Sequence, residues 1–238
     1  MKWTFILGFA NAATADRSLQ LFETTRKSDS KVLILDNHYS ESLNPPNWKA
    51  WAKRLGGEYL DAGRNLGLHN GLNWMLSQVG ATRSDAVIGF DPDTCPLTDA
   101  WDTALFSALQ LPGVGWASLG NRHSESEMEA RGYKESIEVG FKLWTTNHAV
   151  TNSICAFNLD WVLDCGGFQE PSEYYGGLEC AMWKHLTAHG KRWVWLKDYR
   201  EGKFEPDLQD AIYRAYKWDH AHKGWKGSFD DYIKEKMG

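Results

Sequence analysis

The sequence is poor in cysteine, and its few cysteines are not spaced as ligands. There are four in 238 residues, Cys95, Cys155, Cys165 and Cys180. They form no CxxC pair and have no histidine partner at zinc-finger distance, which argues against a zinc module or a disulfide framework. Thiols without such spacing suit a reducing compartment, so we expect a cytoplasmic location.

A long apolar run is also lacking. No stretch approaches the roughly 18 apolar residues that cross a bilayer, so we expect no membrane span. The first fifteen residues imitate a signal peptide, because Lys2 precedes an apolar segment that runs to Ala10 and is followed by small residues. That segment is at the short limit for a signal peptide. We favour a buried first strand at 2–10, which the next elements need as a partner.

Positive charge is not in excess either. The 26 Lys and Arg face 31 Asp and Glu, a net charge of −5, which does not support a general attraction to nucleic acid or to an anionic membrane. The sequence shows no internal repeat and no low-complexity linker, which predicts one domain. Tryptophan, by contrast, is abundant, with 13 residues. Indoles can stack on sugars or bases, but filling the core is their more frequent use.

Apolar runs of strand length alternate with helical segments through the first half of the chain. Strands are expected at 2–10, 31–35, 58–60, 86–90, 114–118, 152–157 and 192–196, and helices at 16–26, 48–55, 68–79, 99–109, 159–164 and 178–189. The polar segment 121–140 is expected to be a solvated loop or a loose helix. The alternation predicts an α/β fold with a mostly parallel central sheet and helices on both faces.

The strongest chemical signal is Asp91-Pro92-Asp93, directly after the apolar strand 86–90. Ligands of such sheets sit beyond the carboxyl ends of the strands. Two carboxylates one residue apart repel each other, and a divalent cation such as Mg²⁺ or Mn²⁺ removes that penalty. Such a cation can bridge two phosphates and stabilise a departing diphosphate. The plainer interpretation is a turn, because Asp and Pro are ordinary turn residues.

Five segments in this order resemble the glycosyltransferase family 2 arrangement on the GT-A, Rossmann-like fold. They are 32–37, 63–68, 86–93, Gly166-Gly167-Phe168 and 175–179. The resemblance spans about residues 2–200 and implies a single GT-A domain. Residues 1–110 would form the nucleotide-sugar-binding half, 111–200 the acceptor-side half and 201–238 a C-terminal helical tail. It also implies an inverting transfer of a hexose, with a uridine nucleotide such as UDP-glucose as the donor.

The resemblance assigns roles on the donor side. Asp36 would accept a hydrogen bond from the nucleobase. Arg64 and Asn65 lie in the loop that approaches the donor, where Arg64 can bind a phosphate. Asp93 would contact the metal directly, and Asp91 would contact the ribose or complete the metal shell. Plain alternatives stand beside these roles, since Asp36 can simply end a strand and Arg64 can be a surface cation.

Glu179 is the candidate general base, which takes the proton of the acceptor hydroxyl. The alternative is that Glu179 only favours a helix N-terminus through the helix dipole. The chain departs from the family here, because the family usually has Glu-Asp where this sequence reads Glu179-Cys180 or, in another alignment, Leu178-Glu179. A thiol replaces a carboxylate poorly, so Glu179 must act as the base or the assignment fails.

His220 and His222 are candidate additional metal ligands, because some GT-A enzymes recruit a late histidine and neutral imidazole suits Mn²⁺. The more frequent explanation of two such histidines is an exposed tail. The basic, aromatic stretch 191–203 can bind nucleic acid, but we favour a strand edge with its solvated flank.

Three functions therefore compete with a transferase that acts on a glycan or a small molecule. A sugar nucleotidyltransferase is disfavoured, because 9–13 is neither glycine-rich nor basic. A DNA-modifying glycosyltransferase that acts on a hydroxylated base would use 191–203 as its contact surface. A non-catalytic nucleotide-sugar-binding protein would explain the missing second carboxylate. The sequence does not identify the acceptor.

Overall fold

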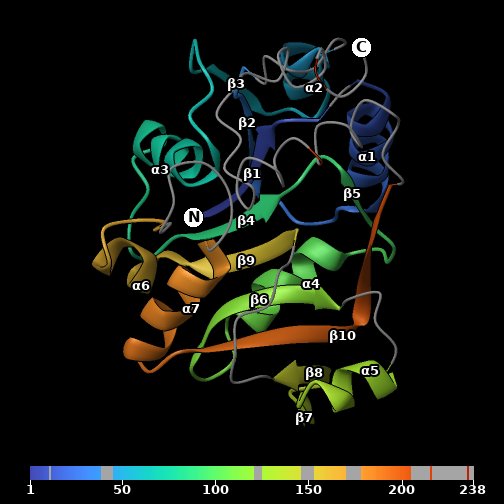
Figure 1. Ribbon diagram of the computed structural model, residues 1–238, viewed down its shortest axis with the longest axis vertical. Helices are drawn as coiled ribbons and strands as arrows, with labels where there is room; N and C mark the ends of the chain where they lie inside the picture. The colour runs from blue at the N-terminus through green and yellow to red at the C-terminus, as the bar shows by residue number, and fades with distance from the viewer. Residues whose placement is uncertain are drawn as a thin grey trace.

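The computed structural model describes residues 1–10, 12–38, 45–120, 125–145, 153–169 and 178–204, together with positions 215 and 235 (Figure 1). The strands are β1 (Lys2–Gly8), β2 (Lys31–Asp36), β3 (Glu58–Asp61), β4 (Ala86–Phe90), β5 (Thr94–Pro96), β6 (Val114–Gly120), β7 (Lys134–Glu138), β8 (Phe141–Thr145), β9 (Ile154–Asn158) and β10 (Arg192–Lys203). The helices are α1 (Ala12–Thr25), α2 (Trp48–Arg54), α3 (Leu68–Gln78), α4 (Trp101–Ala108), α5 (Glu125–Ala130), α6 (Leu159–Asp164) and α7 (Leu178–Ala188).

The described strands form one sheet in the order β3-β2-β1-β4-β9-β6-β10-β8-β7, with β5 paired to the end of β10. The half from β3 to β4 is parallel throughout. Beyond β4 the sheet is mixed, because β9 runs antiparallel between β4 and β6, and β8 runs antiparallel to β10. The predicted α/β fold is confirmed, and its parallel character belongs to the N-terminal half and to the β6–β10 pair.

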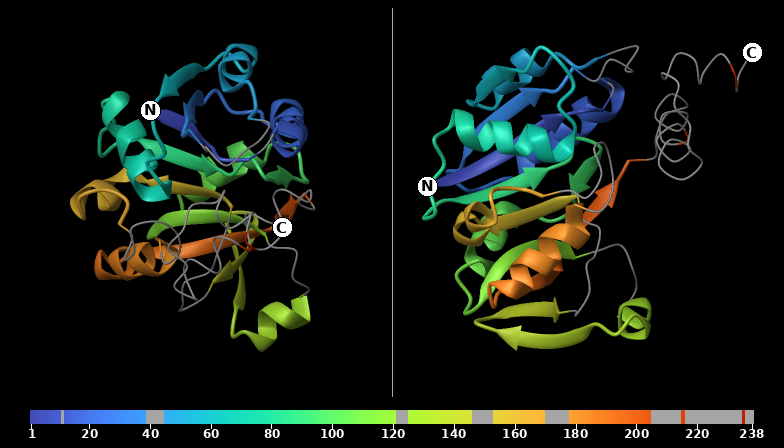
Figure 2. Two further views of the ribbon diagram at one scale, coloured as in Figure 1. Left: turned by 45° about the horizontal axis from the view of Figure 1, so that its top comes forward. Right: turned by 60° about the vertical axis from the view of Figure 1, so that its left-hand side comes forward.

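Helices cover both faces of the sheet, as predicted (Figures 1 and 2). Successive side chains of a strand point to opposite faces. In β2, Val32 and Ile34 join the hydrophobic cluster under α1, α2 and α4, whereas Leu33 and Leu35 join the cluster under α3, α6 and α7. Burial on both faces explains why the parallel strands are continuously apolar.

Several boundaries differ from those expected. The helix expected at 16–26 begins at Ala12, and the last strand continues to Lys203. The segment 121–140 contains α5 and β7, and β7 forms an edge hairpin with β8. The polar composition of β7 hides this strand from pattern analysis. The hairpin turn places both Val139 and Gly140 at positive φ, 47° and 84°. A β-branched residue rarely adopts that conformation, so the turn carries no sequence signal.

The expected first strand is present as β1, which lies between β2 and β4. Of the segment expected as a helical tail, 201–203 forms the end of β10 and Phe204 follows it, and the rest lies outside the described residues except for positions 215 and 235. Among the helices that the structure describes, none combines the length and the apolar character needed to cross a membrane.

Candidate active site

Acidic side chains gather where the parallel strands end. In the register of the sheet, Gly8 of β1 stands beside Asp36 of β2, and Asp36 stands beside Asp61 of β3. On the other side of β1, β4 ends at Phe90 and leads directly into the Asp91–Asp93 turn. Carboxyl ends of parallel strands share one edge, so these acids lie at the edge of the sheet where ligands of such folds bind.

Asp91-Pro92-Asp93 forms a turn, and both of its acidic residues belong to that turn. The carbonyl oxygen of Asp91 accepts hydrogen bonds from the backbone N–H of Thr94 at 3.1 Å and from its hydroxyl at 2.7 Å. Proline suits the second position of such a turn, because its φ is already set. The turn interpretation and the metal interpretation are therefore compatible, since the turn fixes the backbone from which both carboxylates project.

Neighbouring strands hold this turn on both sides. The N–H of Asp91 donates to the carbonyl of Ser153, just before β9, over 3.1 Å. The N–H of Phe204, just after β10, donates to the carbonyl of Asp93 over 3.3 Å. A backbone fixed by strands that lie far apart in sequence gives a preorganised site, which loses little entropy when a ligand binds.

The two carboxylates suit a divalent cation. Asp91 and Asp93 are half-buried, and the Oδ1 atom of Asp93 is fully shielded from solvent. The hard oxygen donors match Mg²⁺ or Mn²⁺. Within the described ranges, no three His, Cys, Asp or Glu side chains come together as a metal cage. His220 and His222 lie outside these ranges.

Asp36 is held by two contacts at the end of β2. Its Oδ1 accepts from the N–H of His38 at 3.1 Å, and its Oδ2 accepts from the hydroxyl of Tyr59 at 3.2 Å. Burial and the nearby Asp36 charge raise the pKa of Tyr59 to about 12, which keeps this hydroxyl protonated as a donor. A carboxylate has about four acceptor positions. Asp36 therefore retains capacity to accept an N–H from a nucleobase.

Asn65 has a clear structural role. Its Oδ1 accepts from Nδ2 of Asn37 at 3.1 Å and from the N–H of Gly67 at 2.9 Å. Asn37, only 2% exposed, also accepts the N–H of Leu66 at 2.9 Å. This pair of asparagines shapes the loop after β3. Arg64 is exposed on the same loop.

Sequence reasoning missed Asp61 and His38. The His38 imidazole is hydrogen-bonded to the Asp61 carboxylate, and this contact raises the pKa of His38 and lowers that of Asp61. The N–H of Gly63 also donates to Asp61, at 2.7 Å. A signal was present in the sequence, because Asp61 follows the short strand expected at 58–60. The strand-end argument that selected Asp36 selects Asp61 equally.

The segments 166–168 and 175–179 are described only in part. Glu179 lies in the first turn of α7, and its side chain is outside the described part of the chain, as are residues 170–177. Phe168 is 1% exposed, and its backbone is held at both polar atoms by Asn73 of α3. Asn73 accepts the N–H of Phe168 at 2.7 Å and donates to its carbonyl at 2.9 Å. The Gly166–Phe168 motif therefore joins α6 to α3.

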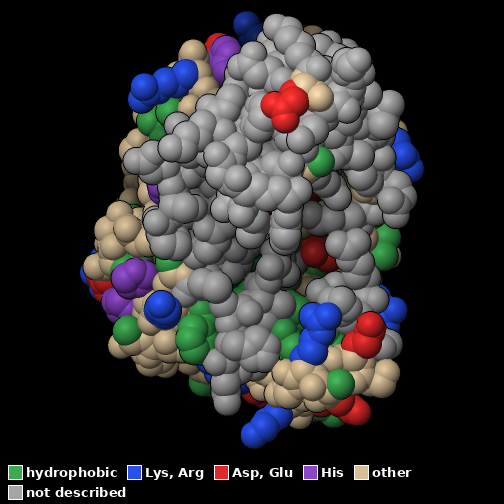
Figure 3. Space-filling view, viewed as in Figure 1, with side chains coloured by type: hydrophobic (Ala, Val, Ile, Leu, Met, Phe, Trp, Pro, Cys, Tyr) green, Lys and Arg blue, Asp and Glu red, His purple; other side chains and the backbone are tan. Residues whose placement is uncertain are grey.

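The stretch 191–203 is an interior strand, where a strand edge was expected, since β10 lies between β6 and β8. Its indoles at Trp193 and Trp195 are each 2% exposed. Lys197 is paired with Glu125 and Glu135 at 2.9 and 3.0 Å. On the face seen in Figure 3, Lys and Arg side chains of the described residues lie scattered near the rim and form no continuous patch. These observations do not favour a nucleic-acid contact.

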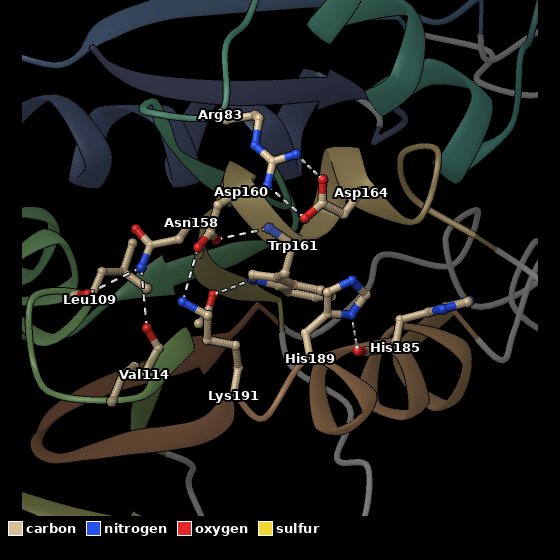
Figure 4. A network of polar contacts seen from close by, with 11 residues as sticks. Arg83, Leu109, Val114, Asn158, Asp160, Trp161, Asp164, His185, His189 and Lys191 are labelled. Atoms are coloured by element: carbon tan, nitrogen blue, oxygen red, sulfur yellow. Dashed lines mark hydrogen bonds and ion pairs between the residues drawn. The ribbon is translucent and has the colours of Figure 1, made fainter.

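The start of this stretch belongs to a polar network at the opposite edge of the sheet (Figure 4). Lys191 pairs with Asp160 of α6 at 2.9 Å. Asn158 donates to the carbonyls of Leu109 and Val114, each at 3.1 Å. Val114 and Arg192 begin the parallel strands β6 and β10, so this network stabilises the amino ends of these strands. The acids described above lie at the carboxyl ends of parallel strands instead.

Comparisons with known proteins identify the fold. No family model and no curated protein matches the sequence. The structure is similar to GalNAc-T7 with UDP, GalNAc and Mn²⁺, with a TM-score of 0.65 and 10% identity over 100% of this chain and 56% of that chain. It is also similar to the mannosyltransferase PcManGT from Pyrobaculum calidifontis in complex with GDP-Man and Mn²⁺, with a TM-score of 0.64 and 14% identity over 98% of this chain and 67% of that one.

A third similar structure is S. aureus TarS 1-349, with a TM-score of 0.59 and 13% identity over 84% of this chain and 60% of that one. This chain thus spans between 56% and 67% of the three structures' lengths. In all, 321 solved chains match, so the likeness does not depend on a single structure. The chain has the GT-A fold that the sequence predicted.

Proposed function

We propose that this chain is a metal-dependent glycosyltransferase that moves a hexose from a nucleotide-diphosphate donor to an acceptor hydroxyl. The observation that carries the proposal is the preorganised Asp91–Asp93 turn after β4, at the same carboxyl edge of a GT-A sheet as Asp36 of β2. Two of the similar structures contain Mn²⁺ together with UDP and GalNAc or with GDP-Man. The proposed donor is a uridine nucleotide such as UDP-glucose.

Each residue has a stated task in this proposal. Asp36 accepts an N–H of the base, and the exposed Arg64 binds a phosphate oxygen. Asp91 and Asp93 hold Mn²⁺ or Mg²⁺, with His220 or His222 as a further ligand. The bound cation supplies charge stabilisation to the departing diphosphate.

Glu179 takes the proton of the acceptor hydroxyl as that oxygen attacks the anomeric carbon. The bond from the anomeric carbon to the diphosphate breaks on the opposite side of the sugar, and the configuration inverts. Glu179 is the single carboxylate in this segment that is offered for the task, because its neighbours Leu178 and Cys180 carry no carboxylate.

Thermal unfolding with and without Mn²⁺ tests donor binding. A ligand at 100 times its dissociation constant stabilises the folded state by about 2.7 kcal/mol. For a chain of this size, that corresponds to a rise in Tm of about 5–10 °C. We expect this rise with UDP-glucose plus Mn²⁺ and a smaller one with GDP-mannose. Asp93→Ala should remove the Mn²⁺-dependent part, whereas Asp99→Ala, which removes an exposed acid beyond the turn, should keep it. An unchanged shift in Asp93→Ala contradicts the metal role.

Donor hydrolysis separates an enzyme from a binding module, because water can replace the unknown acceptor. We expect slow Mn²⁺-dependent release of UDP from UDP-glucose by the wild-type chain. Glu179→Gln should keep the donor-dependent thermal shift and lose hydrolysis by about 10²- to 10⁴-fold, the usual contribution of a general base. Full hydrolysis in this variant would assign the base to another residue. Donor binding without any hydrolysis by the wild type would support the non-catalytic alternative.

A further inference from the structure

A buried glutamate, Glu201, lies near the Asp91–Asp93 turn, where the pairing between strands β6 and β9 ends. Glu201 is near the end of β10 and is 9% exposed. The β6–β9 ladder closes with the pair Ser118 and Cys155, so the first residue of β9 extends beyond it. The pairing of β10 with β6 is irregular near this point, because its register shifts between Leu196, which pairs with Leu119, and Arg200, which pairs with Gly120. Glu201 follows this irregularity directly.

The side chain of Glu201 replaces a strand partner there. In an antiparallel ladder, successive residues bond to opposite neighbours. Because Asp91 donates its N–H to Ser153, the N–H of the next residue, Ile154, points away from β4. It meets Oε2 of Glu201 at 2.9 Å. A buried amide left without an acceptor costs about 1–3 kcal/mol, so this contact fixes the start of β9.

The backbone of Glu201 supports the other side of the same turn. Glu201 pairs with Pro96 of β5, the short strand that follows the turn. Three residues later, the N–H of Phe204 donates to the carbonyl of Asp93. The strand that carries Glu201 therefore holds the exit of the Asp91–Asp93 turn, and the Glu201 side chain holds β9, which binds the entry of the turn through Ser153.

We infer that Glu201 is a positioning residue for the metal site: by joining β9 to β10, it sets the separation and direction of the Asp91 and Asp93 carboxylates. Its relevance to catalysis rests on the proposed function. The inference concerns the acceptor oxygen that Glu201 offers to Ile154, and it requires neither contact with the cation nor a change of protonation. Groups behind metal ligands commonly matter in this way, and their loss weakens metal affinity about 10- to 100-fold.

Three substitutions separate the hydrogen bond from the charge and from the volume of the side chain. Glu201→Gln keeps the length and a carbonyl oxygen that accepts the N–H of Ile154. Glu201→Asp keeps the charge but is one methylene too short to reach that N–H in place. Glu201→Ala removes both the charge and the acceptor oxygen. Asp198→Ala is the matched control, because it removes an acid from the same strand that is 55% exposed and paired with Lys142 at 3.8 Å.

Two readouts test the inference in the full chain. The first is hydrogen exchange of the peptide that spans 86–96 in the metal-free protein. The second is the dissociation constant of Mn²⁺, measured by electron paramagnetic resonance in the presence of UDP. We expect faster exchange and at least about tenfold weaker Mn²⁺ binding in Glu201→Ala and Glu201→Asp. Glu201→Gln and Asp198→Ala should remain within about threefold of the wild type, since they keep the bond to Ile154.

The outcomes are distinct. If the peptide 86–96 exchanges hydrogen at the wild-type rate in Glu201→Asp, the inference is overturned. It is also overturned if Glu201→Gln binds Mn²⁺ as weakly as Glu201→Ala, because the charge of the side chain would then matter more than its hydrogen bond. If Glu201→Ala fails to fold, Glu201→Asp and Glu201→Gln still decide the question. A wild-type chain that binds no Mn²⁺ contradicts the proposed function alone, and the exchange data still test the connection between β9 and β10.

Discussion

The asparagine pair that shapes the loop after β3 allows a prediction about two substitutions of the same kind. Oδ1 of Asn65 only accepts, from Asn37 and from the N–H of Gly67. Asn37 both donates through Nδ2 and accepts the N–H of Leu66 through Oδ1. Asn65→Asp therefore keeps every bond, whereas Asn37→Asp turns a donor into an acceptor that faces another acceptor at about 3.1 Å.

The magnitudes follow from burial. Asn37→Asp loses one hydrogen bond, about 1 kcal/mol, and places a carboxylate at a position that is only 2% exposed in the wild type. The burial adds about 1–3 kcal/mol, so the free energy of unfolding should fall by about 2–4 kcal/mol. Asn65 is exposed, and Asn65→Asp should change the free energy of unfolding by no more than about 0.5 kcal/mol. In the proposed function this loop carries the phosphate-binding Arg64, so Asn37→Asp should also weaken donor binding.

Urea unfolding near neutral pH measures the difference, with equal slopes required for the comparison. The pH dependence gives a second check. Burial raises the pKa of the new carboxyl in the folded state, so its destabilising effect is present above that pKa and is relieved as the pH falls toward about 5 and the protonated group can donate to Asn65. Equal losses in the two variants, or no loss in Asn37→Asp, would refute the hydrogen-bond assignment.

Two further predictions concern the same edge of the sheet. His38 has a raised pKa because of its hydrogen bond to Asp61, so the stability from this pair is fully present below the ordinary pKa of about 6.5 and is lost as the pH rises through the raised value. Asp61→Asn should lower the pKa of His38, measured by an NMR titration of its ring; an unchanged value contradicts the pairing. Gly8→Ala should reduce the free energy of unfolding by about 1–3 kcal/mol, because the new methyl carbon would lie 2.7 Å from Trp48 and 2.8 Å from a backbone oxygen. Unchanged urea unfolding would show that the backbone relaxes there.

Sequence reasoning succeeds where the signal is local. The strand Ala86–Phe90 and the helix Leu159–Asp164 have the predicted bounds, because burial makes the strand continuously apolar and the helix has a clear apolar face. The edge strand β7 was missed, since one exposed face and a short hairpin leave little hydrophobic pattern. Asp36, Asp91 and Asp93 were selected by their place after strands, which is also a local signal.

Contacts between distant segments could not be predicted in this way. Nothing near Glu201 in the sequence indicates that it meets Ile154, because that contact depends on where β6 and β9 separate. The interior place of β10 likewise depends on β8, which pattern analysis did not detect. Asn65 was chosen as a donor-binding residue from its loop, whereas its partner Asn37 became visible only in the folded arrangement.

The interior position of β10 has a consequence for the order in which the protein matures. Pro96 pairs with Glu201 in the sheet, and the ribosome adds 105 residues (201 − 96) after Pro96 before this partner has been synthesised. At the usual rates of synthesis this takes roughly 5–20 s. Residues 1–110 are therefore synthesised before the strand that holds the exit of the Asp91–Asp93 turn exists. A fragment that ends near residue 110 contains both aspartates of the turn and lacks the strand that closes it.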